Sequence, residues 1–116
     1  MITLFSVFIG GGIGSLLRWI CCNFIPTHWG TMLVNICGAF FIGIAYAYFA
    51  KNGTLNPEVK LFIMTGLLGG FTTFSTYLLN FITLINGNNY AEAFLYLISS
   101  VLIGSLFLLL GIKLTA

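Results

Sequence analysis

The chain has 116 residues, of which 59% are hydrophobic and only 5% are charged, and its formal net charge is +2. A soluble domain carries roughly a quarter charged residues, so four basic and two acidic side chains cannot cover a surface that faces water. The composition therefore excludes a soluble globular protein. The small net charge also argues against nucleic acid as a partner.

Four long apolar segments account for nearly the whole chain. A membrane-spanning helix needs about 20 mostly apolar residues, and turn residues such as Asn-Gly and Asn-Pro separate the segments. The N-terminal segment has no basic region or cleavage site, so it is interpreted as a helix and not as a signal peptide. We expect one all-α transmembrane domain over residues 1–116, multi-pass in the inner cell membrane, with helices at about 3–24, 31–50, 59–86 and 92–114.

The basic residues predict an orientation. Four helices place both termini and the 51–58 loop on one side of the membrane, together with Lys51, Lys60 and Lys113. Arg18 lies near the other end of the first helix. Three basic residues against one predict cytoplasmic termini. The bias is weak, and insertion in both orientations stays open.

The first predicted helix carries small residues and one charge on a single face. Gly10, Gly14 and Arg18 are spaced by four residues. Small residues allow the backbone of another helix to approach closely. Arg18 either extends to the membrane interface or faces an aqueous vestibule for anions, and the sequence leaves both readings open.

The second predicted helix repeats this spacing. Its one strongly polar member, Asn35, either makes a hydrogen bond across a helix interface or donates its amide NH2 to a passing anion. Asn35 lies on a face whose other residues are small. The residues of this face, spaced by four, are Thr31, Asn35, Ala39, Gly43 and Ala47.

The third predicted helix contains the strongest anomaly. Gly69 and Gly70 are followed by Thr72 and Thr73, and two glycines before β-branched residues favour a break in the helix. The break frees carbonyls that lipid cannot satisfy, so they must be buried in protein or bind something. Carbonyls within residues 69–73 are suited to a cation. No carboxylate is nearby, which favours a monovalent ion such as sodium over a divalent one, and a second chain at a two-fold axis would double the ligands.

Aromatic and hydroxyl side chains alternate beyond the break, at Phe74, Ser75, Thr76 and Tyr77. Aromatic ring edges are electropositive, so Phe74 and Tyr77 on one face are able to line an anion path without a fixed charge. Plain packing is the alternative for such an aromatic pair.

The fourth predicted helix adds a further polar face. Tyr96, Ser100 and Gly104 are spaced by four residues, with Ser99 and Ser105 beside them. These hydroxyls either continue a polar track from the third helix or bond back to carbonyls of their own helix.

Three ordered motifs carry a resemblance over essentially the whole chain. Gly-Gly-x-x-Gly-x-x-x-Arg runs from residue 10 to 18, Gly-Thr-x-x-Val-Asn-x-x-Gly from 30 to 38, and Gly-Gly-x-Thr-Thr-Phe-Ser-Thr from 69 to 76. In these motifs the chain resembles the small bacterial fluoride channels of the CrcB/Fluc family. The resemblance implies passive, fluoride-selective export that lowers cytoplasmic fluoride. It also implies an antiparallel dual-topology homodimer with two pores.

The resemblance further implies roles for single residues. A structural sodium ion, not transported, would be held by backbone carbonyls of Gly69 and Thr72 from both subunits. Arg18 would belong to the aqueous vestibule. The fluoride path would include ring edges, hydroxyls and one amide, from Asn35, Phe74, Ser75, Thr76, Tyr77, Tyr96 and Ser100.

The chain departs from the family pattern at two positions. The family usually has phenylalanine where this chain has Tyr77, and commonly a glutamate where it has Asn80. The first change adds a hydroxyl at the aromatic pair, and the second removes a charge near a pore mouth.

Two other functions fit the sequence less well. A small multidrug-type exporter, which moves cations against protons, also has four helices, but it needs a carboxylate inside the membrane, and Glu58 and Glu92 lie at helix ends. An enzyme would need a nucleophile and its partners, but the only histidine, His28, falls in a predicted loop without an acidic partner to complete a triad. We therefore expect a channel.

Overall fold

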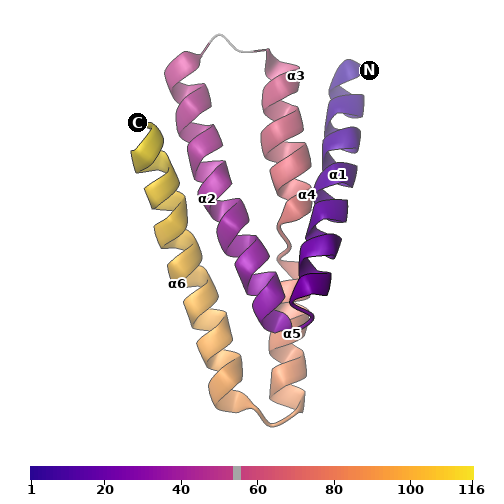
Figure 1. Ribbon diagram of the computed structural model, residues 1–116, viewed down its shortest axis with the longest axis vertical. Coiled ribbons are helices and arrows are strands. Elements are labelled where there is room, and N and C mark those ends of the chain that lie inside the picture. The colour runs from indigo at the N-terminus through magenta and orange to yellow at the C-terminus, as the bar shows by residue number, and fades with distance from the viewer. Residues whose placement is uncertain (54–55) are drawn as a thin grey trace.

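The computed structural model describes residues 1–53 and 56–116, and every regular element in these residues is helical. These residues form four candidate membrane spans, and neighbouring spans in the chain run in opposite directions (Figure 1). Three of the spans are single helices, and the third is built from four consecutive pieces. The elements are α1 (Ile2–Phe24), α2 (His28–Asn52), α3 (Pro57–Lys60), η1 (Leu61–Leu68), α4 (Gly69–Phe71), α5 (Ser75–Asn86) and α6 (Tyr90–Thr115).

Four helices in the described residues are long and apolar enough to cross a membrane, with the third running from Pro57 to Asn86. The molecule extends 51 Å along its longest axis. Both termini lie at the same end as the close of α2 and the start of α3 (Figure 1), as the even number of spans predicted. Large apolar side chains along α1 and α6 are exposed, which suits a surface that faces lipid.

The helix ends lie within a few residues of the predicted bounds. α2 begins three residues earlier than expected, because Thr27 caps it by accepting a hydrogen bond from the Trp29 N–H at 3.3 Å. The sequence predicted that His28 lies in a loop, but His28 is the first residue of α2. At the start of α3 the Asn56 side chain accepts from the Glu58 N–H at 3.0 Å, with Pro57 in the first turn.

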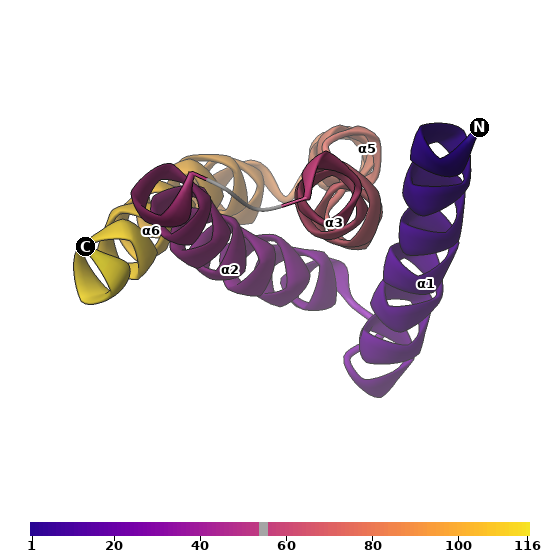
Figure 2. The same cartoon turned by 90° about the horizontal axis from the view of Figure 1, so that it is seen from above.

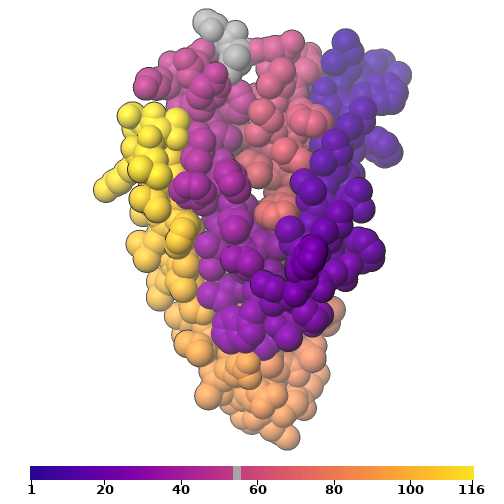
Figure 3. Space-filling view, in the orientation of Figure 1, coloured from indigo at the N-terminus to yellow at the C-terminus, as the bar shows by residue number. Residues whose placement is uncertain are grey.

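The spans form two pairs that are packed through glycine. α1 packs along η1 and α4, while α2 packs along α6. Figure 2 shows α1 and α6 at opposite flanks, and Figure 3 shows α2 between them on one face. A Cβ atom at Gly14 would lie 2.1 Å from the Leu67 carbonyl oxygen, and one at Gly43 would lie 2.2 Å from that of Leu108. Only glycine allows these backbones to approach so closely.

The third span is interrupted, but three residues beyond the predicted point. Gly69 has helical angles (φ −62°, ψ −40°), and the chain becomes extended at Thr72 (φ −90°, ψ 158°). The glycine pair therefore belongs to the helix, and the prediction that the break falls on it was wrong. Gly70 meets α1, where a Cβ atom would lie 2.5 Å from the Gly11 carbonyl oxygen. Close packing explains this glycine better than helix breaking does.

The helix before the break is also irregular. Residues 61–68 form a π-helix, in which the chain is wound more widely than in an α-helix, and the Gly69 N–H reaches back to the Met64 carbonyl. π-Helical turns are rare in proteins, and those that occur often lie at functional sites. Only α4, residues 69–71, separates the π-helix from the interruption at residues 72–74.

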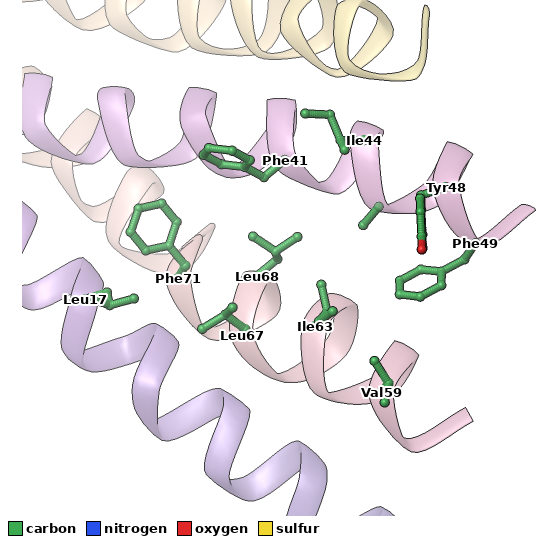
Figure 4. A pocket seen from close by; sticks show the side chains of 11 residues that line it. Leu17, Phe41, Ile44, Tyr48, Phe49, Val59, Ile63, Leu67, Leu68 and Phe71 are labelled. Atoms are coloured by element: carbon green, nitrogen blue, oxygen red, sulfur yellow. The ribbon is translucent and has the colours of Figure 1, made fainter. Parts of the chain in front are cut away.

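An apolar groove of about 660 Å³ separates α2 from η1. Figure 4 shows side chains from both helices pointing toward it. They are nearly all hydrocarbon, so the groove has no chemistry suited to an ion. The lining residues are Leu17, Phe41, Ile44, Ala45, Tyr48, Phe49, Val59, Ile63, Leu67, Leu68 and Phe71.

Candidate functional site

Asn35 holds the extended segment of the third span. Its Nδ2 donates to the Thr73 carbonyl at 2.9 Å, and its Oδ1 accepts from the Thr73 N–H at 2.8 Å. The amide thus satisfies both backbone groups of a residue that has left the helix. Of the two roles open for Asn35, the hydrogen bond across a helix interface is present. The second amide hydrogen is not used in this contact, so the anion-binding role stays a prediction.

Arg18 also reaches the interruption. Its Nε donates to the Gly70 carbonyl at 3.1 Å, and Ser15 Oγ lies 3.5 Å from the same oxygen. The side chain is half-buried and turned toward the third span. This brings a positive charge next to the break. The predicted role in a vestibule stays a prediction.

Some carbonyl oxygens at the break accept hydrogen bonds, and others do not. The Leu68 oxygen accepts from both the N–H and the hydroxyl of Thr72, each at 3.1 Å. The carbonyls of Gly70 and Thr73 are bonded as described above. In the described part of the chain no donor reaches the carbonyls of Gly69 and Thr72. These are the two oxygens that the family resemblance assigned to sodium.

The chemistry of this donor set suits a monovalent cation. The described residues contain no cluster of His, Cys, Asp or Glu side chains able to hold a metal. Neutral carbonyl oxygens are hard ligands without charge, which suit sodium and bind divalent ions poorly compared with carboxylates. Gly69 and Thr72 therefore fit the predicted ion, although a single chain offers only two such oxygens.

Gly38 has a role at this site that was not predicted from the sequence. A Cβ atom on Gly38 would lie 2.2 Å from Thr72 Cγ2, so α2 leaves space for the threonine at the start of the break. A hollow of about 290 Å³ lies beside it, and Phe74 on its rim is 71% exposed. The residues lining this hollow are Asn35, Gly38, Ala39, Ile42, Thr72, Thr73, Phe74 and Leu108.

The hydroxyl residues after the break lie at the start of α5. The Thr73 hydroxyl accepts from the Thr76 N–H at 3.2 Å and lies 3.4 Å from Ser75 Oγ. Thr73 thus supports the first turn of α5 through its side chain. Ser75 is exposed and Thr76 is half-buried.

Three aromatic rings follow one another from the break into the protein. The Phe74 and Tyr77 ring centroids are 5.9 Å apart, and those of Tyr77 and Tyr96 are 5.3 Å apart. The Tyr77 hydroxyl donates to the Leu97 carbonyl on α6. The hydroxyl by which this chain departs from the family pattern is therefore bound to a neighbouring helix.

Asn80, the second departure, connects three spans. Its Nδ2 donates to Thr31 Oγ1 at 3.1 Å and to the Tyr96 hydroxyl at 3.3 Å. Tyr96 is fully buried. Tyr96 was predicted to lie on the fluoride path, but its connection to Thr31 through Asn80 was not predicted. The detectable signal was an asparagine in a membrane helix, which needs a partner.

Ser99 and Ser100 of α6 differ in their hydrogen bonds, and the predicted polar track stays a prediction. Ser99 Oγ bonds back to the Leu95 carbonyl of its own helix. Ser100 Oγ is buried and has no hydrogen-bond partner among the described residues. A buried hydroxyl without a partner is costly, which makes Ser100 the serine suited to meeting a ligand.

The sequence is similar to known proteins along most of its length. Residues 5–112 match the family described as "CrcB-like protein, Camphor Resistance (CrcB)". A protein of Hydrogenobaculum sp. (strain Y04AAS1) named "Fluoride-specific ion channel FluC" is 41% identical over 111 residues, which cover 91% of each chain. A protein of that name from Aquifex aeolicus (strain VF5) is 37% identical over 93% of this chain and 92% of its own. In Yersinia pestis, "Fluoride-specific ion channel FluC 1" is 44% identical over 78% of this chain and 76% of its own.

Proposed function

This chain belongs to the CrcB family, and on that premise we propose that it is a fluoride-specific ion channel, through which fluoride leaves the cell passively. It is a multi-pass protein of the cell membrane and not an enzyme. The observation that carries the proposal is the interruption of the third span. Asn35 holds the backbone of the interruption in place. Beside it lie the unsatisfied carbonyls of Gly69 and Thr72 and the exposed ring of Phe74.

Fluoride must lose its water to pass a narrow protein path, and hydrogen-bond donors have to replace that shell. The candidates here are the second amide hydrogen of Asn35, the Ser100 hydroxyl, and the ring edges of Phe74 and Tyr77. Ser75, Thr76 and Tyr96 complete the proposed path. Because none of these side chains is ionised, they can release the anion as readily as they bind it. Arg18 raises the local concentration of anions at the vestibule.

We propose an antiparallel homodimer as the working unit. In one chain the interruption is open on one side: Phe74 is 71% exposed and Ser75 is exposed. The free carbonyls of Gly69 and Thr72 would be costly in lipid. A second copy related by a two-fold axis covers this face and brings an equivalent pair of oxygens. Fusing a protease-cleavable tag to one terminus tests dual topology, since about half of the tags should be cleaved when protease is added to sealed spheroplasts. Cleavage of all or none contradicts it.

We further propose that a structural sodium ion, which is not transported, is bound by the Gly69 and Thr72 carbonyls of both subunits. Support comes from the absence of hydrogen-bond donors to these oxygens among the described residues. Gly38→Ala tests the site, because the new Cβ displaces Thr72. The variant should need a higher sodium concentration than the wild type to remain dimeric in detergent, as measured by size exclusion in sodium and in a large organic cation. An identical sodium dependence of the two proteins contradicts the site.

A multidrug-type exporter remains the alternative class. Its mechanism needs a carboxylate within the membrane, whereas Glu58 and Glu92 lie in the first turns of α3 and α6. The described spans hold no other acidic side chain. No observation in the structure favours this alternative.

Ion efflux from liposomes that contain the purified protein tests the proposed function. Fluoride should leave rapidly and chloride should not. Phe74→Leu and Asn35→Ala should each abolish fluoride efflux while the protein still elutes as a dimer. Phe8→Leu is the matched control, since Phe8 is 78% exposed on α1, away from the break. Equal efflux of both anions, or wild-type efflux in both variants, contradicts the proposal.

A further inference from the structure

We infer that His28 is a positioning residue, which holds the Tyr96 ring in the fluoride path and is itself held by Glu92. The inference rests on the proposed function, because it assigns a cause to the placement of a residue in that path. No motif that carries the family resemblance contains His28 or Glu92. Both lie in the first turns of their helices, α2 and α6, and their side chains meet.

The His28 ring lies among aromatic rings. Its centroid is 4.9 Å from that of Tyr96, with the rings at 81°, which is an edge-to-face contact. Its centroid is 4.6 Å from that of Trp29, at 45°. The His28 side chain is only 15% exposed. Edge-to-face contacts of this kind favour one relative orientation of the two rings.

Glu92 is the charged group within reach of His28. Glu92 Oε1 lies 3.1 Å from His28 Nε2, and this nitrogen is buried without a well-aligned hydrogen bond among the described residues. Glu92 is 44% exposed, so its carboxylate reaches solvent as well as the ring. A carboxylate in the first turn of a helix is also stabilised by the helix dipole. The 3.1 Å approach of these two atoms therefore places the histidine against the start of α6.

Three aromatic rings contact the Tyr96 ring. The centroid of His28 is the nearest at 4.9 Å, followed by those of Tyr77 at 5.3 Å and Trp29 at 6.0 Å. The Tyr96 hydroxyl then accepts from Asn80 at 3.3 Å. If the His28 ring is lost, the Tyr96 ring loses the nearest of its three aromatic contacts, and the position of its hydroxyl is less restricted. His28 does not need to touch the ion to affect its passage.

Fluoride efflux of four variants tests the inference. His28→Leu removes the ring and should slow efflux roughly tenfold, within the range of effects between residues in contact. His28→Phe restores an aromatic ring but cannot reach Glu92, and should recover most of the loss, to roughly threefold below the wild type. Glu92→Gln should also lose roughly threefold. Glu58→Gln, at the first turn of α3, is the matched control and should match the wild type.

Coupling separates positioning from general stability. Glu92→Gln should have no further effect on efflux in the His28→Phe protein, because the nitrogen it would contact is gone. Additive losses, or equal efflux from His28→Leu and wild-type dimers, overturn the inference. If His28→Leu does not fold, Glu92→Gln decides, and unchanged efflux in that variant overturns the inference. A wild-type protein that passes no fluoride contradicts the proposed function instead.

Discussion

The two halves of the third span are held in place by opposite means. The half before the break, residues 57–71, lies against α1 at glycine positions where main chains nearly touch. The half after it, α5, is held by side-chain hydrogen bonds, from Asn80 to α2 and α6 and from Tyr77 to α6. Asn35 holds the segment between the halves.

This difference predicts which substitutions each half tolerates. Main chains in close contact have no space for an added atom, so the first half is sensitive to gains in volume. Hydrogen-bonded side chains in an apolar surrounding are sensitive to the loss of one partner, since the other is left unsatisfied. The changes below test each half where its contact is closest.

The largest effect is expected from Gly14→Ala. The added Cβ would lie 2.1 Å from the Leu67 carbonyl oxygen and 2.8 Å from the Phe71 nitrogen. Both are backbone atoms that cannot rotate away, so we expect a loss of roughly 3 kcal/mol or more in stability. The loss should appear as a lower midpoint of thermal unfolding in detergent. Gly12→Ala is the control, as nothing lies within 4 Å of its Cβ. Equal midpoints would show that α1 and η1 are not packed this closely.

Asn35→Ala should come next. It leaves both the N–H and the carbonyl of Thr73 without partners, at a cost of roughly 2 to 3 kcal/mol. Asn35→Asp retains the acceptor but not the donor and should be destabilised too, which separates the two bonds. Hydrogen exchange at residues 72–74 measures the effect directly. Unchanged protection of the Thr73 amide would show that Asn35 does not hold the break.

A smaller effect is expected at Asn80. Asn80→Leu removes the donors to Thr31 and Tyr96 and should cost roughly 1 to 2 kcal/mol. Asn80→Glu should be tolerated within roughly 1 kcal/mol, because both partners are hydroxyls that can donate to a carboxylate instead. Thermal unfolding of the two variants, compared in one detergent, checks this order. The reverse order would contradict the hydrogen-bond network.

Tyr77→Phe should have the smallest effect. It removes the hydroxyl bonded to the Leu97 carbonyl, which keeps its place in the α6 backbone, so the loss should be roughly 0.5 to 1 kcal/mol. The ring stays between Phe74 and Tyr96, and fluoride efflux should remain within roughly threefold of the wild type. A complete loss of efflux would place the Tyr77 hydroxyl itself in the path.

The elements of the site differ in how far the sequence predicted them. Asn35 was recognised as the polar member of a small-residue face, and one of its two predicted roles is present. The break was predicted from Gly69 and Gly70 but lies at residues 72–74. The network of Thr31, Asn80 and Tyr96 was not predicted, because its members come from three spans and no spacing within one helix relates them.

Composition and segment length were sufficient to predict a membrane protein with four spans, because lipid requires about 20 apolar residues in each span. The even number of spans was sufficient to place both termini on the same side of the membrane. The position of the interruption depends on contacts between spans. Gly70 packs against Gly11, and Asn35 satisfies Thr73 three residues later. A helix breaks where other helices supply the hydrogen bonds that it gives up, and those partners are distant in the chain.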